Sequence, residues 1–517
     1  MTQSVHEQQA ASRALPVIRL DQLWAILAVL LVAVFISLFP TAPHDFWWHL
    51  KAGEIVATAG IPTTNLFAWT LPADHPYTYQ SWLGEWLFYQ LYALGGLPLT
   101  IFARNLLGAI LFGLVAWETQ LRTGSWRWGA LACVLAAAMT INNLNARTQN
   151  WSWLPFMAVF MLLSRYSEGR LRPRWLAALP LIMMFWVNAH GAFIMGILVC
   201  GAFTAGETLR RMLRQPRALG WDRLRWLYLA AAGMGLATIV NPLGVGVFRY
   251  VGSLLNDTIS QRLVIEWQTP DPRNLAGMFF YLGVLVVIVA FGLQRRRPTF
   301  SELLLVCGLA WQAFIGVRYV VWFGVVAMPI AAQALAAPRA VFSADPASGI
   351  SPRERGAGSV INLLTVLLLL AMVVSVQPWF KWRIPWPEPY QALFVEMPGA
   401  AQLFNARTPV AAVEHLRAEP CLGPIFNEMG YGSYMAWALY PQAQAFIDPR
   451  IELYPPELWE DYVELNAGRD VANLLERYGI GCVLLDTQVQ PALAAAMIEL
   501  PGWERSFAGG QSEVWRR

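Results

Sequence analysis

Long apolar segments dominate this sequence, and they constrain its fold more than any other feature. Only 14% of its 517 residues are charged, whereas a soluble globular protein carries about a quarter. A helix of about 20 apolar residues is long enough to cross a bilayer. The recurring apolar runs therefore predict a polytopic α-helical membrane protein.

Eleven segments are predicted as spanning helices, with a retained anchor rather than a cleaved leader at the start. Several are shorter than the ~20 residues that a bilayer requires, which is typical of helices that end in a protein-lined cavity. The segments are 23–39, 98–117, 128–141, 151–163, 175–188, 192–206, 226–240, 278–293, 303–317, 319–335 and 362–376.

Arginine placement predicts the orientation, because cytoplasmic loops are rich in Lys and Arg. With Arg13 and Arg19 on the cytoplasmic side, every second loop is basic, including the cluster from Arg210 to Arg225. Counting the apolar segment 82–97 as a span would place that cluster outside. We therefore interpret 82–97 as an interfacial helix, and we expect the chain after about residue 377 to lie outside the cytoplasm.

The predicted organisation has three parts. Residues 1–20 form a cytoplasmic tail, residues 21–377 form a transmembrane module with a long first outer loop at 41–81, and residues 378–517 form an extracytoplasmic domain. In that last part, short strands are predicted at 424–427, 445–448 and 481–485, helices at 470–478 and 491–500, and a hairpin at 504–508 and 513–516. The alternation predicts a small α/β domain.

The five cysteines form no CxxC pair, so a zinc or redox motif has no support. Cys421 and Cys482 both fall in the C-terminal domain. Two small buried thiols are the favoured interpretation there, and a disulfide is the alternative.

The first outer loop contains HDFWWHLKAGE, from His44 to Glu54, and another carboxylate, Glu85, follows at the start of the interfacial helix. Asp45 and Glu85 are the predicted catalytic residues, because a carboxylate there could act as a general base on a hydroxyl acceptor. Asp45 and His49 are candidate ligands of a divalent metal. A helix N-terminus at Asp45, and membrane anchoring by Trp47 and Trp48, are the structural alternatives to catalysis and sugar stacking.

Other polar residues cluster at the same predicted face. Arg104 lies in the second span, Arg147 in an outer loop, His190 in a tight turn and Arg318 between two apolar helices. Ionisable groups within the membrane are costly, so each is a candidate functional residue. We predict that Asp45, Arg104, His190 and Arg318 line one outward-facing cavity, in which arginine would bind phosphate through its planar set of donors.

The C-terminal domain adds further candidates. Glu428 follows one predicted strand, while Asp448 and Arg450 end another, and open α/β sheets often bind ligands at such positions. Hydrogen bonding within a loop, or an ion pair, would explain the same residues equally well. The predicted substrate-binding set is Trp47, Trp48, His49, Arg104, Arg147, His190, Arg318, Glu428, Tyr431, Asp448 and Arg450.

These residues resemble the GT-C superfamily of integral-membrane glycosyltransferases. Members have a long first outer loop with an acidic catalytic residue just after the first helix, and Asp45 in PHDFWW matches that position. DFWWHLKAGE, WVNAHGAF and NPLG are similar to a bacterial subgroup. The segment NEMGYG, from Asn427 to Gly432, is similar to the aromatic-acidic-Tyr-Gly motif of oligosaccharyltransferases, although the tryptophan pair of that motif is missing. The resemblance covers about residues 20–377.

The resemblance implies a GT-C fold at the bacterial inner membrane and an inverting transfer of sugar from a polyprenyl phosphate to a cell-envelope acceptor. The sequence contains no P-loop and no G-x-G-x-x-G motif after a strand, and no nucleic-acid partner is expected. Membrane lipids are the expected surroundings, and a divalent metal is the candidate cofactor. A lipid or glycan transporter and a non-catalytic envelope assembly protein are the alternatives; no clear internal repeat supports the transporter.

Overall fold

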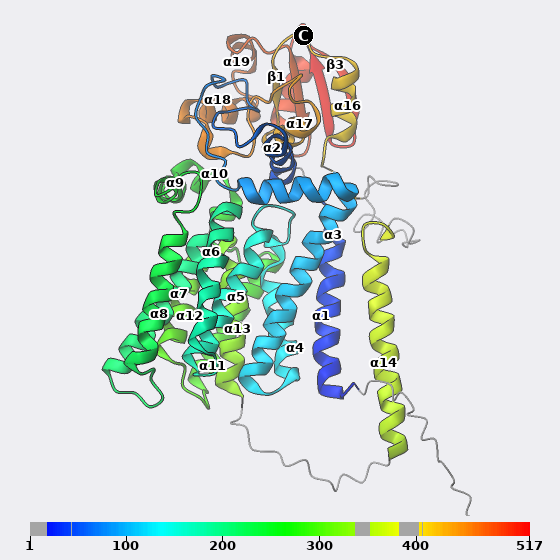
Figure 1. Cartoon of the computed structure of the whole chain (residues 1–517). Helices are drawn as coiled ribbons and strands as arrows, with labels where there is room; N and C mark the ends of the chain where they lie inside the picture. The colour runs from blue at the N-terminus through cyan, green and yellow to red at the C-terminus, as the bar shows by residue number, and fades with distance from the viewer. Residues whose placement is uncertain (1–17, 43, 337–351, 382–402, 406) are drawn as a thin grey trace, which may run out of the picture.

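The computed structural model describes residues 18–42, 44–336, 352–381, 403–405 and 407–517. Residues 1–17 of the predicted tail, with Arg13, lie outside this set. A bundle of roughly parallel and antiparallel helices occupies one end of the molecule and a small mixed α/β domain occupies the other (Figure 1). Three short helices and the first half of a long one lie between them.

Each of the eleven predicted spans coincides with a helix of the bundle. Within the described residues, five helices are long and apolar enough to cross a membrane. The bundle helices are α1 (Leu20–Leu38), the second half of α3 (Trp82–Thr123), α4 (Trp126–Met139), α5 (Asn150–Ser167), α6 (Ala178–Ala189), α7 (Phe193–Met212), α8 (Trp221–Ala237), α11 (Leu275–Gly292), α12 (Phe300–Ile315), α13 (Val320–Leu335) and α14 (Pro352–Ser375).

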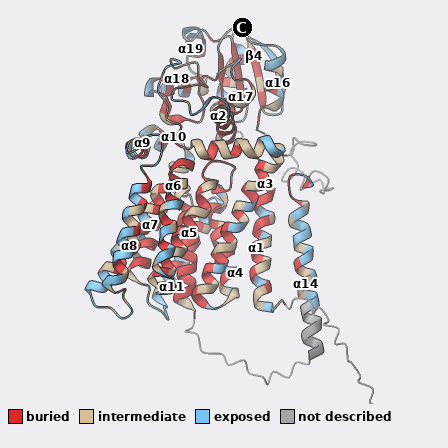
Figure 2. Ribbon diagram, in the orientation of Figure 1, coloured by how far each residue is buried: buried red, intermediate tan, exposed pale blue. Residues whose placement is uncertain are grey.

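Burial follows the requirements of a lipid environment. Helix α13 is buried along nearly its whole length, while α14 exposes Ile361, Leu364 and Leu368. Figure 2 shows the buried centre of the bundle and the exposed outer helices. Long helices with apolar outer faces are typical of proteins that span a lipid bilayer.

As predicted for an interfacial helix, the segment 82–97 does not run parallel to the helices of the bundle. Helix α3 has non-helical backbone at Gly95 and Gly96, and the φ of Gly96 is +66°. Glycine adopts this left-handed conformation without steric cost. The chain therefore turns there, and the first half of α3 lies across the end of the bundle (Figure 1).

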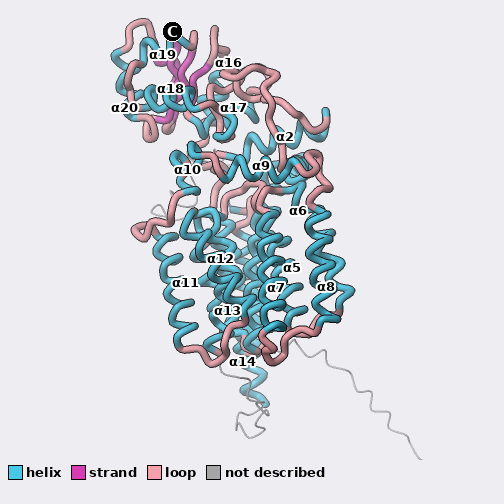
Figure 3. Tube along the Cα trace, turned by 90° about the vertical axis from the view of Figure 1, so that its left-hand side faces the viewer, coloured by secondary structure: helices cyan, strands magenta, loops and turns pink. Residues whose placement is uncertain are grey.

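Three short helices and the linking 3₁₀ turns complete the region between bundle and domain. They are α2 (Asp45–Ala59), α9 (Gly246–Leu255) and α10 (Thr258–Leu263), with η1 (Ile141–Asn143), η3 (Ile265–Trp267) and η4 (Val317–Tyr319). The turn η2 (Pro173–Ala177) instead joins α5 to α6 at the other end of the bundle. Helix α2 lies within the predicted long loop. Figure 3 shows α9 and α10 between the bundle and the C-terminal domain, and α10 contacts η7 (Ile451–Leu453) of that domain.

The C-terminal domain is built on a four-stranded sheet with strand order β1-β2-β4-β3. Strands β1 and β2 are parallel, and the other pairs are antiparallel. The strands are β1 (Ile425–Asn427), β2 (Cys482–Asp486), β3 (Glu504–Gly509) and β4 (Ser512–Arg516); the helices are α16 (Val410–Ala418), α17 (Met429–Ala438), α18 (Pro456–Asn466), α19 (Val471–Arg477) and α20 (Pro491–Glu499).

The strand predicted at 445–448 is wrong, because the first loop takes its main-chain hydrogen bonds. The Ala445 N–H donates to the Phe67 carbonyl at 2.8 Å, and the Trp69 N–H donates to the Ala445 carbonyl at 3.0 Å. This segment therefore joins the loop 41–81 to the C-terminal domain instead of extending the sheet.

The expectation of two free thiols in the C-terminal domain is also wrong. Cys421 and Cys482 form a disulfide with a Cα–Cα distance of 6.1 Å. It ties the segment before β1 to the first residue of β2. Disulfides persist in oxidising compartments and are rare in the cytosol.

We expect Cys421→Ser to destabilise the C-terminal domain. The bridge closes a loop over a sequence separation of 61 residues, and the chain-entropy model gives about 4 kcal/mol for a loop of that length. Thermal unfolding with and without reductant measures this, and Cys307→Ser, at an exposed thiol in α12, is the control. A reductant effect that is equal in wild type and Cys421→Ser would contradict the bridge.

Candidate active site

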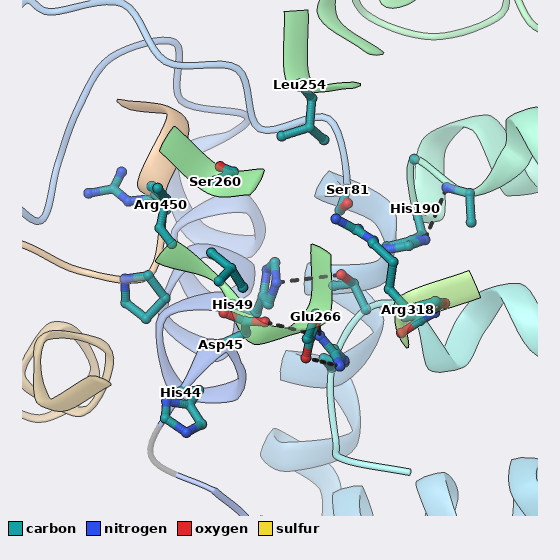
Figure 4. Close-up of a pocket in the computed structure, with 18 of the residues that line it drawn as sticks. His44, Asp45, His49, Ser81, His190, Leu254, Ser260, Glu266, Arg318 and Arg450 are labelled. Atoms are coloured by element: carbon teal, nitrogen blue, oxygen red, sulfur yellow. Dashed lines mark hydrogen bonds and ion pairs between the residues drawn. The ribbon is translucent and has the colours of Figure 1, made fainter. Parts of the chain in front are cut away.

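A cavity of about 680 Å³ lies between the bundle and the C-terminal domain. Its walls come from the first loop, the beginning of α3, the α4–α5 connection, the α6–α7 turn, α9 to η3, η4 and η7. Figure 4 shows residues from these separate elements facing one space. An outward-facing cavity is expected from the sequence, and the structure shows which of the candidate residues line it.

Asp45 is the first residue of α2 and lines the cavity. Its carboxylate lies 3.6 Å from Arg147 Nη1. Helix α2 is held in place by close packing, because a Cβ at Gly53 would lie 2.1 Å from the carbonyl oxygen of Glu85. The Trp48 N–H also donates to Ser433 Oγ of α17 at 3.0 Å. Bundle and C-terminal domain together therefore fix the position of Asp45.

Arg147 lies between two carboxylates. Besides Asp45, it binds Glu266 of η3 through both terminal nitrogens, with Nη1 2.6 Å from Glu266 Oε2. Figure 4 shows Asp45 and Glu266 near each other, between Arg450 and Arg318. The charge of Arg147 is therefore balanced by Glu266 and Asp45.

His49 and Glu85 form a second pair, joined by a hydrogen bond, in the lining of the cavity. His49 Nδ1 lies 2.9 Å from Glu85 Oε1, and Thr148 Oγ1 lies 3.5 Å from His49 Nε2. Glu85 is only 1% exposed. This burial leaves Glu85 little access to a substrate, so the structure favours a positioning role over the predicted catalytic one.

Arg318 and His190 face the cavity from the bundle. The Arg318 guanidinium lies 4.3 Å from the centre of the Trp267 ring. No carboxylate of the described residues lies within 4.0 Å of it. His190 Nδ1 accepts a hydrogen bond from the Ala192 N–H at 3.1 Å, which places the ring proton of neutral His190 on Nε2. Arg318 therefore has donors available for an anion.

Arg104 does not reach the cavity, contrary to expectation. It is fully buried, and it donates to the carbonyls of Leu144 and Phe39 at 2.8 and 2.9 Å. Neither Glu85 nor any other acidic residue of the described chain pairs with it. Its guanidinium satisfies the main chain of two connections, so Arg104 is a structural residue.

Four predicted substrate-binding residues are packed inside the protein. Trp47 stacks on Phe404 with ring centres 5.0 Å apart and is 1% exposed, which excludes both sugar stacking and membrane anchoring for this side chain. Glu428 caps α17 by accepting the Tyr431 N–H at 2.9 Å, and Tyr431 accepts from Ser512 Oγ at 3.1 Å. Asp448 is fully buried beside Arg450. Trp48, in contrast, lines the cavity.

Arg450 links the C-terminal domain to the first loop. Its guanidinium binds Asp448 Oδ2 at 2.6 Å and Asn65 Oδ1 at 3.0 Å. The rings of Tyr77 and Phe67 lie 4.8 and 4.9 Å from it. Arg450 borders the cavity but is 1% exposed, so its charge is used to hold the two parts together.

Three residues that line the cavity are absent from the predicted set of site residues. Glu452 of η7, Tyr77 of the first loop and Tyr250 of α9 line one wall. Tyr77 Oη donates to Glu452 Oε1 at 3.4 Å. No spacing in the sequence connects residues so far apart. Only the position of Glu452 two residues after Arg450 could have drawn attention to it.

The side chains of the site do not form a metal centre. Among the described residues, no group of three or more His, Cys, Asp or Glu side chains is arranged to hold an ion. Arg147 approaches the Asp45 carboxylate, and both nitrogens of His49 have partners. A guanidinium beside the candidate ligand opposes binding of a divalent cation, so the predicted Asp45–His49 metal site does not fit.

Glu266 provides a test of the Arg147 cluster by pH. Burial raises the pKa of Glu266, but the adjacent Arg147 outweighs burial and lowers it below the ordinary value. A lowered folded-state pKa stabilises the protein above about pH 4.3, and this stabilisation is lost as the pH falls through the folded pKa. We expect Glu266→Gln to lower thermal stability at pH 7, and we expect the difference between the two proteins to shrink once the pH falls below about 4.3. An equal difference above and below that pH would contradict the ion pair.

Comparison with known proteins shows the fold. No family model and no curated protein matches the sequence. The structure of ArnT from Cupriavidus metallidurans bound to undecaprenyl phosphate matches with a TM-score of 0.51 and 14% identity over 95% of this chain and 97% of ArnT. The apo ArnT structure matches with a TM-score of 0.51, 16% identity, 95% and 96% coverage. Archaeal oligosaccharyltransferase AglB from Archaeoglobus fulgidus is less similar, with a TM-score of 0.49, 13% identity, and 94% and 74% coverage. The chain has the GT-C fold of membrane glycosyltransferases, as the resemblance implied.

Proposed function

We propose that this chain, which has the GT-C fold, is a glycosyltransferase that moves a sugar from a polyprenyl phosphate to a cell-envelope acceptor. The observation that carries the proposal is the shared cavity of Asp45 and Arg318. One is a carboxylate that can accept a proton, and the other is a guanidinium with no carboxylate within 4.0 Å in the described chain. A transfer from a phosphate leaving group needs both functions.

In the proposed reaction, Asp45 acts on the acceptor and Arg318 acts on the donor. The Asp45 carboxylate accepts the proton of an acceptor hydroxyl. The acceptor oxygen then bonds to the anomeric carbon as the bond from that carbon to the phosphate oxygen breaks. Arg318 stabilises the negative charge on the departing polyprenyl phosphate, and His190 Nε2 is a second donor beside it. Inversion at the anomeric carbon is what the family resemblance implies.

The proposed location is the outer face of the inner membrane, with the N-terminus in the cytoplasm. The Cys421–Cys482 disulfide in the C-terminal domain supports an oxidising, extracytoplasmic location. Arginine clustering at the opposite end of the bundle supports the same orientation. Residues 21–377 would form the membrane module and 378–517 the domain that covers its cavity.

Binding of undecaprenyl phosphate to the purified protein in nanodiscs tests the donor site. We expect Arg318→Gln to weaken binding about 10- to 100-fold, because a charge-assisted hydrogen bond is worth roughly 1.5–3 kcal/mol. Arg273→Gln, at an exposed arginine before α11, is the control. Unchanged binding in Arg318→Gln would remove the phosphate assignment.

Transfer from a panel of undecaprenyl-phosphate sugars separates an enzyme from a transporter. The proposed enzyme releases undecaprenyl phosphate and forms a new glycoside. A flippase would instead move the intact lipid between the leaflets of a proteoliposome, and lipid movement without glycoside formation would refute the enzyme.

A further inference from the structure

The carboxylates of the cavity are not equivalent. Asp45 and Glu266 pair with Arg147, and Glu85 pairs with His49. Glu452 differs, because no Arg, Lys or His nitrogen of the described chain lies within 4.0 Å of it. A partly buried carboxyl without a cation costs free energy unless it is protonated or has a ligand.

The surroundings of Glu452 resemble a site for a neutral polar group. Tyr77 and Tyr250 line the same wall, and Tyr77 Oη lies 3.4 Å from Glu452 Oε1. Burial is the main cause that raises the pKa of Glu452; a main-chain hydrogen bond and Arg450 oppose it without reversing it. A carboxyl group accepts hydrogen bonds at its oxygens whether or not it carries a proton, and a sugar hydroxyl supplies the matching donor.

The position of Glu452 places this group on the acceptor side. Glu452 belongs to η7 of the C-terminal domain, whereas Arg318 belongs to η4 of the bundle. In Figure 4 Arg450, two residues before Glu452, lies at the opposite edge of the cavity from Arg318. A lipid-linked donor whose phosphate binds Arg318 leaves the wall of the C-terminal domain for the second substrate.

We infer that Glu452 is a specificity-determining residue for the acceptor, and that it binds a hydroxyl group of a neutral, polyhydroxylated molecule. This inference rests on the proposed function, since it names the acceptor class of the same cavity. The Tyr77 hydroxyl holds the Glu452 carboxyl in place, and Tyr250 lines the same cavity. An acceptor with an ammonium group would instead form an ion pair with the Glu452 carboxylate.

Saturation-transfer NMR with two soluble probes, methyl glucoside and methyl glucosaminide, tests the inference on the full chain loaded with undecaprenyl phosphate. We expect Glu452→Leu to weaken methyl glucoside binding about tenfold or more, because the hydroxyl loses its partner. Glu452→Gln keeps a donor and an acceptor and should stay within about threefold of wild type. Glu457→Gln, at an exposed carboxylate in α18, should match wild type.

Each of the other outcomes contradicts a different part of the proposal. Wild type that binds neither glycoside, or Glu452→Leu that binds methyl glucoside as wild type does, overturns the inference. Tighter binding of methyl glucosaminide that is lost in Glu452→Gln overturns the neutral acceptor in favour of a cationic one. Undecaprenyl phosphate affinity shows that the variants are folded. Its absence in wild type would refute the donor assignment of the proposed function, while glycoside binding that depends on Glu452 would still support this subsite.

Discussion

Asp45→Asn is expected to lower kcat for sugar transfer by roughly 100- to 10,000-fold, the range that positioned general bases contribute. Asparagine has nearly the same shape but cannot accept the acceptor's proton. The variant keeps the α2 backbone, which is fixed by Gly53 and Ser433 rather than by the carboxylate. Turnover with the productive undecaprenyl-phosphate sugar measures the effect.

A carboxylate in the same loop is the matched control. Asp74 is exposed and does not line the cavity, so Asp74→Asn should turn over at the wild-type rate. Undecaprenyl phosphate binding should remain in Asp45→Asn, since Arg318 is untouched. Turnover of Asp45→Asn equal to wild type would leave the enzyme assignment standing but remove Asp45 from the reaction.

Arg450→Met is expected to cost about 3–5 kcal/mol of stability, because it leaves Asp448 buried without its cation. Both side chains are fully buried. The guanidinium also holds Asn65 of the first loop. The variant should therefore unfold at a lower temperature and should also lose turnover, because the cavity wall separates from the loop that carries Asp45.

Two further variants separate charge from packing. Arg450→Met combined with Asp448→Leu removes both charges and should recover part of the lost stability, since paired apolar replacements of buried ion pairs are often tolerated. Arg469→Met breaks an exposed pair with Glu464 and should change the unfolding temperature little. A double variant that is less stable than Arg450→Met alone would contradict the proposed cause.

Several site residues could be predicted because their chemistry is anomalous where they occur. Asp45 follows directly on an apolar helix, and His190 and Arg318 occupy turns between apolar helices. Ionisable groups are costly near a membrane. Their occurrence beside apolar helices could therefore be recognised as a sign of a functional site from the sequence alone. The structure places all three on one cavity.

The remaining assignments depended on partners distant in sequence. Arg104 and Arg318 are both arginines at the ends of apolar helices, and nothing local distinguishes them. Arg104 is structural because the Leu144 and Phe39 carbonyls, 40 and 65 residues away, reach its guanidinium. Arg318 stacks on Trp267 and keeps its donors free.

The sequence by itself determined the membrane class, the position of each bundle helix and most elements of the C-terminal domain, because apolar length, periodicity and arginine placement are local properties that lipid and water act on directly. Only the tertiary structure decided which polar groups are satisfied. It paired Arg450 with Asp448 inside an aromatic cage, joined Cys421 to Cys482 and left Glu452 without a cation. The physical reason is that burial and pairing depend on the neighbours of a group in space, and these come from loops far apart along the chain.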